Sequence, residues 1–176
     1  MKTFFEINIS PKLGMVCCNP TSRMKNVIIY VGEKITFSGV KHVVTLINDN
    51  NNAYSVDYDA FCNKYCYVGT SEEKVGKLFD VGEDGNEFTI EASDVIESKR
   101  GGILYVIAEV YNNTFGETFC KLISERGAKR TVEARYMKSM FDYKGKSVCN
   151  VKNLFTEKQN TDFSVWKLLK KKFGKL

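Results

Sequence analysis

Short hydrophobic runs separated by polar turns fill the first part of the chain. From Val27, the runs VIIYV, KITF and HVVTLI follow one another, with Gly32-Glu33 and Gly39 between them. The polar stretch NDNNN at residues 48–52 predicts a tight hairpin, because Asn and Asp tolerate left-handed backbone. With the strand that follows, the pattern predicts four short strands within about forty residues.

The same kind of pattern continues beyond a polar segment at residues 62–73. A strand at 77–81, a turn at 82–85 and a returning strand at 87–92 are predicted next. The most hydrophobic run, ILYVIAEVY, then leads through a polar turn to predicted strands at 117–123 and 129–134. The chain is therefore expected to be mainly β.

One stretch, AYSVDYDAF at residues 53–61, recurs along the chain. It begins with the two-residue alternation of a strand, and similar patterns return at residues 88–96 and, more loosely, at 130–137. Such recurrence predicts a repeated structural unit in which each copy is a closing strand. In the third copy Arg130 and Arg135 make the pattern basic, which places the expected function there.

The last residues have the spacing of a helix. Phe163, Trp166, Leu169 and Phe173 recur every three or four residues after a capping Asp162, with lysines between them. The chain is thus predicted to divide into an N-terminal arm (1–26), a barrel unit (27–67), a short β-hairpin unit (68–98), a third, basic β unit (99–145) and a basic C-terminal region with a short amphipathic helix (146–176).

Composition narrows the class of protein. The 176 residues are 43% hydrophobic, enough for a sizeable core, and no apolar run is long enough to span a membrane. Glu6 interrupts the start of the chain where a signal peptide would be apolar. We therefore expect a cytoplasmic protein with no membrane partner.

The six cysteines are expected to be reduced, and a structural zinc site needs two closely spaced ligand pairs. Only Cys62 and Cys66 form such a pair, so no metal is expected. Cys120 is predicted to be a small buried hydrophobe, and the single histidine, His42, a surface or packing residue.

Catalytic motifs are hard to find. With one histidine, no Ser-His or Cys-His pair can be nominated, and neither GxSxG nor a glycine-rich phosphate loop occurs. Asp57, Asp59, Glu91 and Asp94 would allow a metal-dependent nuclease, but they recur with the strand pattern and fit a solvated strand face better. The sequence favours a protein without catalytic activity or cofactor.

The charge is distributed unevenly. The net charge is +5, and residues 117–176 hold 15 Lys/Arg against 6 Asp/Glu, whereas residues 1–116 hold 11 against 15. This asymmetry predicts a polyanionic partner, most commonly nucleic acid. Aromatic residues among the basic ones suit phosphate contacts combined with stacking. The candidate nucleic-acid-binding residues are Arg126, Lys129, Arg130, Arg135, Lys138, Lys144, Lys146, Lys167, Lys170, Lys171 and Lys172.

Residues 31–61, VGEKITFSGVKHVVTLINDNNNAYSVDYDAF, resemble a KOW or Tudor-type small β-barrel module. Such modules open with VGxxVxF, continue through a VVxLI-like strand and a polar hairpin, and end with an aromatic-rich strand of the YxVxYxxF kind. The resemblance implies tandem small barrel-like units. A Tudor-type aromatic cage could use Tyr54, Tyr58, Phe61 and Tyr65, although a core role suits these rings better.

A KOW-like module beside a basic C-terminal region, in a small asparagine-rich protein, is similar to phage early proteins of the MotB type. That resemblance implies a DNA-binding modifier of transcription that acts on the host nucleoid, in the host cytoplasm.

The combined prediction is a non-catalytic protein that binds double-stranded DNA with little sequence preference, through phosphate contacts, and modulates transcription or nucleoid organisation. A host nucleoid or transcription protein is a further expected partner. Two alternatives stay open. One is an adaptor or inhibitor that binds a host protein through a barrel groove, and the other is an RNA-binding protein.

Overall fold

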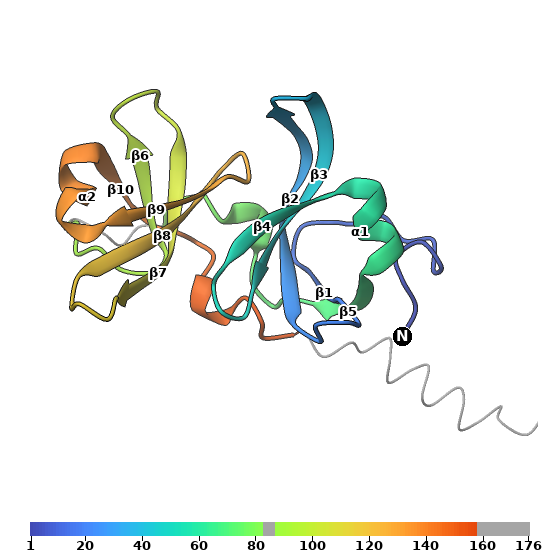
Figure 1. The fold of residues 1–176 in the computed structure, drawn as a ribbon. Coiled ribbons are helices and arrows are strands. Elements are labelled where there is room, and N and C mark those ends of the chain that lie inside the picture. The colour runs from blue at the N-terminus through green and yellow to red at the C-terminus, as the bar shows by residue number, and fades with distance from the viewer. Residues whose placement is uncertain (83–86, 158–176) are drawn as a thin grey trace, which may run out of the picture.

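The computed structural model describes residues 1–82 and 87–157. The predicted C-terminal helix, with Lys167, Lys170, Lys171 and Lys172, lies outside the described residues. Within the described residues the protein is mainly β, as predicted, and consists of two antiparallel five-stranded sheets (Figure 1). No helix in the described part is long and apolar enough to cross a membrane.

The first unit has the strand order β4-β3-β2-β1-β5, so the fifth strand returns to lie beside the first. Helix α1 connects β4 to β5, and the 3-10 helix η1 follows β5. The elements are β1 (Met15–Cys18), β2 (Lys25–Thr36), β3 (Gly39–Asn48), β4 (Ala53–Asp57), α1 (Tyr58–Lys64), β5 (Cys66–Thr70) and η1 (Val75–Lys77).

The second unit repeats this connectivity with the order β10-β6-β7-β8-β9. A short helix again precedes the fifth strand, and a 3-10 helix again follows it. The elements are β6 (Asp94–Ser98), β7 (Leu104–Asn112), β8 (Thr118–Ser124), β9 (Lys129–Glu133), α2 (Ala134–Met140), β10 (Phe141–Lys146) and η2 (Val151–Asn153). In the described residues the strand pairing leaves both sheets open at their edges.

The hairpin between the third and fourth strands shows how closely the two units correspond. Asn48 Oδ1 accepts hydrogen bonds from the backbone N–H groups of residues 50 and 52, each at 3.0 Å. Ser124 Oγ, 76 positions later, accepts from residues 126 and 128 at 3.2 and 2.9 Å. The third turn residue is left-handed in both copies, with φ of 58° at Asn51 and 73° at Gly127. The chain therefore contains two copies of one structural unit.

Two of the three predicted sequence copies match this duplication. Residues 53–61 and 130–137 both run from the fourth strand into the helix. Each of these copies was predicted to be a closing strand, but the strand ends at Asp57 or Glu133 and the rest of the stretch is helical. Residues 88–96 are not a third copy, since they lead into β6, which corresponds to β1 and pairs with β7 and β10. Alternation of apolar and polar residues does not distinguish the first strand of a unit from its fourth strand.

The strands predicted at 77–81 and 87–92 are not formed. Residues 75–77 are a 3-10 helix, and Val81 makes only an isolated bridge to Ser147. The physical reason is that Val75 and Leu78, three residues apart, both point into a core, at 4% and 1% exposure. A helical turn satisfies that spacing and a strand does not.

Two other predicted features also differ from the structure. Gly32-Glu33 does not form a turn but lies inside the continuous strand β2. A Cβ at Gly32 would lie 2.7 Å from the Tyr30 hydroxyl, so the glycine makes room for that ring. The predicted N-terminal arm contributes β1, whose Val16 and Cys17 are fully buried.

The two units exchange the segments that follow their fifth strands. In the first crossing segment (residues 71–82), the end pairs beyond β10: Val148 N donates to Asp80 O at 2.8 Å. In the second (residues 147–157), the end pairs beyond β5: Glu72 N donates to Thr156 O at 2.7 Å. Val148 lies 76 positions after Glu72, and Thr156 lies 76 positions after Asp80, so the two bonds are equivalent. The contact is therefore isologous, as in a two-fold dimer.

A core lies between the units as well as within each. Its buried members come from both copies and from both crossing segments: Val16, Val27, Ile29, Ile47, Ala53, Val75, Leu78, Val106, Ala108, Ile123, Cys149, Val151 and Leu154. Separate clusters fill the first unit, around Phe61 and Leu46, and the second, around Met137 and Leu122. The units are thus joined by a continuous apolar interface.

Candidate nucleic-acid interface

Strand β9 is the edge strand of the second sheet and carries two of the predicted cations. It pairs only with β8 in the described part of the chain, so its outer side is unpaired. Lys129 and Arg130 are its first two residues, and Arg126 lies in the turn before it; all three are exposed. Because successive side chains of a strand point to opposite faces, Lys129 and Arg130 flank the edge on its two sides.

Helix α2 continues this line of charge. Met137 is fully buried and fixes the helix against the second core, while Arg135 and Lys138 are exposed. The Arg135 Nε lies 2.7 Å from a Glu133 carboxylate oxygen, and its guanidinium lies 4.8 Å from the centroid of the Tyr136 ring. We call Arg126, Lys129, Arg130, Arg135 and Lys138 the basic edge.

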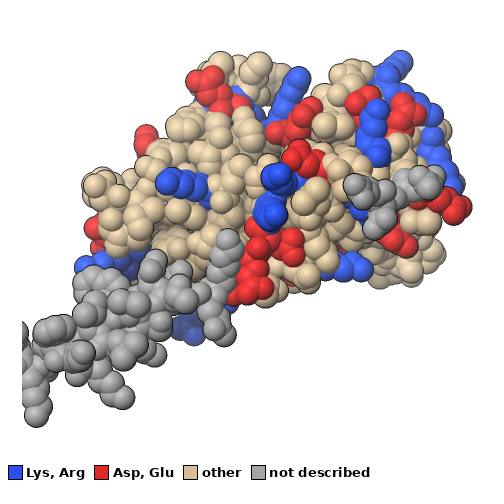
Figure 2. Space-filling model, turned by 180° about the vertical axis from the view of Figure 1, so that it is seen from behind, with Lys and Arg blue, Asp and Glu red and all other residues tan. Residues whose placement is uncertain are grey.

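Local contacts bring several of these cations to one end of the second unit. The Arg130 guanidinium lies 5.6 Å from the centroid of Phe141, the first residue of β10. Lys99 donates from its backbone to Met140 O at 3.0 Å and from Nζ to Lys138 O at 3.1 Å. Figure 2 shows Lys and Arg side chains gathered toward the right-hand end of the molecule, which is the second unit, with acidic groups among them.

The two predicted cations on β10 have acidic partners within the chain. Lys146 Nζ lies 2.5 Å from Asp94, which is fully buried, and 2.9 Å from Glu91. Burial works against the charged amine, but the hydrogen bonds to Asp94 and Glu91 outweigh it and raise the pKa of Lys146. The Lys144 Nζ lies 3.7 Å from Glu97 on the neighbouring strand β6. Lys146 thus neutralises a buried carboxylate.

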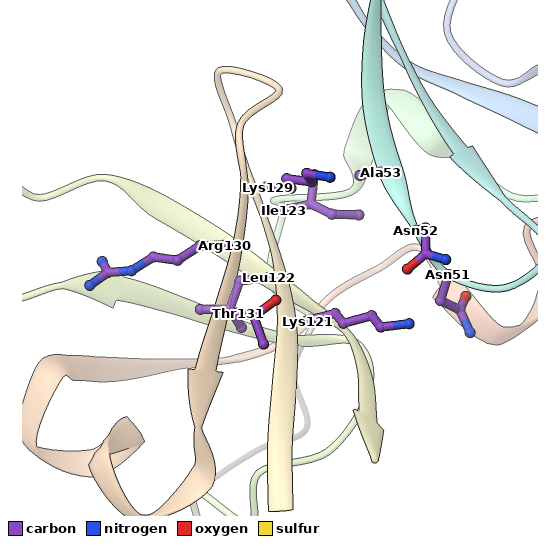
Figure 3. A pocket seen from close by; sticks show the side chains of 9 residues that line it. All are labelled: Asn51, Asn52, Ala53, Lys121, Leu122, Ile123, Lys129, Arg130 and Thr131. Carbon is purple, nitrogen blue, oxygen red and sulfur yellow. The ribbon is translucent and has the colours of Figure 1, made fainter. Parts of the chain in front are cut away.

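A cavity of about 210 Å³ opens between the units on the inner side of β9 (Figure 3). Lys121 and Lys129 extend into it from β8 and β9, toward Asn51, Asn52 and Ala53 of the first unit, whereas Arg130 points away. Lys121 Nζ also donates to Asn50 O at 3.3 Å and lies 2.8 Å from Glu109. Lys121 is therefore ion-paired with Glu109, whereas Lys129 has no ion pair within the described residues.

Lys121 was missed by the sequence prediction. Lys121 and Ile123 are two residues apart on β8 and therefore point to the same face. Across the strand pair they lie opposite Thr131 and Lys129, so Lys121 shares the inner face with Lys129. That two-residue alternation was present in the sequence. The sequence did not show that the first unit's hairpin lies opposite Lys121, because strand patterns do not reveal how the two copies pack together.

The aromatic residues considered for a cage are mostly core. Phe61 is fully buried and Tyr65 is 6% exposed, and their rings stack with centroids 4.7 Å apart. The Tyr54 hydroxyl donates to Asn26 at 2.6 Å, and burial raises its pKa well above the usual range. The predicted core role is therefore confirmed for Phe61 and Tyr65.

Cys120 and His42 agree with their predicted roles. Burial raises the pKa of the Cys120 thiol to about 11 and that of Cys149 to about 12, so both stay protonated at neutral pH. Cys120 is fully buried, as predicted. His42 is exposed and stacks on Tyr58 at 4.2 Å. Over residues 1–82 and 87–157, no group of three or more His, Cys, Asp or Glu side chains could hold a metal ion.

Comparison with known proteins gives no family for this chain: no protein-family model matches it, and no curated protein sequence matches it.

Proposed function

We propose that the protein is a non-catalytic nucleic-acid-binding protein that holds double-stranded DNA along the basic edge with little sequence preference. The observation that carries this proposal is the run of five exposed cations along one open edge strand and the helix that follows it. Of these, Arg126, Lys129, Arg130 and Lys138 have no ion pair within the described residues, so their charges are free to meet phosphates.

The size of the basic edge suits a duplex backbone. A five-residue strand spans roughly 16 Å, and one DNA strand presents a phosphate about every 3.4 Å along the helix axis. Lys129 and Arg130 lie on the two sides of the strand, so they can contact different phosphates along the duplex. Contacts of this kind fix the protein on the duplex without reading bases, which supports sequence-tolerant binding.

The folding unit supports the resemblance to KOW and Tudor-type modules. Each copy has five antiparallel strands, the fifth beside the first, and the motif at residues 31–61 covers β2 to α1. We infer that each copy is a small barrel-like unit of this type. On this proposal the second copy binds the DNA, in line with a phage-type protein that modulates transcription or nucleoid organisation in the host cytoplasm.

The test is fluorescence anisotropy of a labelled duplex of about 30 base pairs, titrated with the full chain at several salt concentrations. Each phosphate contact adds about 0.9 to the negative slope of log K against log salt, so the five cations of the basic edge contribute about −4 to −5 to the slope. Two unrelated duplex sequences should give the same affinity. Absence of binding at low salt, or binding that salt does not weaken, would contradict the proposal.

A pair of triple variants separates local contact from net charge. Lys129→Glu, Arg130→Glu and Lys138→Glu together should reduce the salt slope by about three and weaken binding to both duplexes alike. The control is Lys12→Glu, Lys64→Glu and Lys74→Glu, which reverses three exposed lysines outside the second sheet. Equal losses in the two triples would show that net charge alone is responsible. Preference for an RNA competitor of the same length would favour the RNA-binding alternative.

A further inference from the structure

The hairpin of β2 and β3 extends beyond the first unit as a two-stranded arm (Figure 1). Between Glu33 and His42 no residue of this arm is buried, while Val43 and Val44 at its base are. Hydrogen-bonded pairing continues to Thr36 and Gly39 at the tip. The outer arm contributes nothing to the cores within the described chain.

The arm carries an apolar tip and one basic face. Phe37 in the turn is fully exposed, and Ile35 and Val40, directly opposite each other, are 86% and 62% exposed. On the other face Lys34, which is half-buried and donates from Nζ to Ser55 Oγ at 3.4 Å, lies directly opposite the exposed Lys41. Like charges in that position destabilise a strand pair, and exposed apolar side chains gain nothing from folding. Exposed apolar side chains gathered beside charged ones are typical of an interaction surface.

The arm is rigid at its base and at its tip. The Tyr30 hydroxyl donates to Glu33 O at 2.8 Å and covers the face of the strand at Gly32. At the tip, Thr36 Oγ1 donates to Gly39 O at 2.8 Å, and Gly39 has a φ of 113°, which favours glycine. These bonds brace the backbone on both sides of Phe37, whose side chain projects into solvent.

The base of the arm touches the start of the basic edge. A Cβ at Gly127, next to Arg126, would lie 2.7 Å from Thr45 Oγ1 and 3.0 Å from the Tyr30 ring. The turn between β8 and β9 therefore packs on the residue that braces the arm. A duplex that follows the basic edge toward Arg126 reaches the arm next.

We propose that the arm enters the minor groove of the DNA held by the basic edge, with Phe37 inserted as a wedge between base pairs. Lys34 and Lys41 then meet the phosphates that border the groove. Minor-groove proteins use apolar side chains in this way to kink the duplex, and the groove carries little sequence information, which suits sequence-tolerant binding. This inference rests on the proposed function, because it requires that the protein binds duplex DNA.

The second unit provides a matched control for Phe37. Its corresponding hairpin, β7 and β8, also ends in an exposed phenylalanine, Phe115, followed by the left-handed Gly116. Around that tip the charge is acidic rather than basic: Glu117 is bonded to Asn113, and no lysine pair lies across the strands. Phe115→Ala removes the same side chain from a hairpin that we do not expect to enter DNA.

The experiment measures energy transfer between dyes at the two ends of a duplex of about 30 base pairs, saturated with the full chain. The wild-type protein and Phe115→Ala should shorten the end-to-end distance, while Phe37→Ala should leave the duplex straight. Phe37→Ala should also bind roughly tenfold more weakly, with an unchanged salt slope. Lys34→Gln with Lys41→Gln should reduce the salt slope by about two.

Each outcome decides between the ideas. Binding without bending, or equal bending by wild type and Phe37→Ala, overturns the wedge and leaves the proposed function intact. No binding by any variant overturns both. Self-association in sedimentation velocity that Phe37→Ala abolishes, with bending unchanged, would show that the arm pairs with a second copy and would overturn the groove proposal.

Discussion

At the scale of single residues, the basic side chains of the second unit differ in what they can do. Lys146 is bound to Asp94 and Glu91, and Asp94 also accepts from the Glu91 backbone at 2.8 Å. Arg130 and Lys138 have no such partners in the described chain. The sequence could place all these charges on the second unit, but not separate them. The partners of Lys146 are more than fifty positions away, and only pairing of β10 with β6 brings them together.

Replacing Lys146 should therefore destabilise the fold. Lys146→Met leaves the Asp94 carboxylate buried without its cation and should lower the free energy of unfolding by about 2–4 kcal/mol. This is less than for a fully buried pair, because 32% of the Lys146 side chain is exposed. The control Lys144→Met removes the longer and more exposed ion pair with Glu97. It should lower the free energy of unfolding by about 0.5 kcal/mol or less. Urea unfolding followed by circular dichroism measures both, and equal costs would contradict the structural role.

At the scale of elements, strands were easier to predict than their ends. The strands β7, β8 and β9 lie within one or two residues of their predicted ranges, because each is a long apolar or alternating run. Glycine was the weak point. Gly32 was interpreted as a turn, but it serves the packing of Tyr30, and no local pattern distinguishes the two uses. The basic edge was predictable as a charged stretch, but its exposure on an edge strand needed the strand order.

The β8–β9 turn offers a direct test of packing between the units. Gly127 and Gly116 both have left-handed backbone, with φ of 73° and 79°, so an alanine at either pays about 1–2 kcal/mol for its conformation. Only at Gly127 would the new methyl group also collide with Thr45 and Tyr30. Gly127→Ala should thus lower the melting temperature clearly more than Gly116→Ala. Similar losses in calorimetry would show that the turn can move away from the first unit.

At the scale of the whole molecule, the duplication is the main organising fact. The segments YVGTSEEKVGKLF and YKGKSVCNVKNLF begin at Tyr67 and Tyr143 and share Tyr, Gly, Ser, Val, Leu and Phe at the same positions. The 76-residue repeat is therefore detectable in the sequence. It was obscured because the arm makes the first copy's β2–β3 hairpin longer, and because a turn of helix that serves the shared core resembled a strand.

The shared core should make the two units unfold together. Leu154→Ala removes a fully buried side chain from the second crossing segment, in a cluster with residues of both sheets. The expected loss is about 2–5 kcal/mol. Scanning calorimetry should show one transition before and after the substitution, with equal calorimetric and van't Hoff enthalpies. Two separate transitions, of which Leu154→Ala shifts only one, would contradict cooperative unfolding.

The exchange of crossing segments also has a consequence for the order of synthesis. A ribosome releases the first unit well before Val151, Leu154 and Thr156, which cover its apolar face and pair beyond β5. During this interval the nascent first unit exposes valine and isoleucine side chains that attract chaperones. Native burial of that face waits for residue 157 to emerge. A truncated chain that ends before residue 157 would leave the apolar face of its first unit exposed, and would be prone to aggregation and proteolysis. Synthesis through residue 157 is therefore a condition for burial of that face.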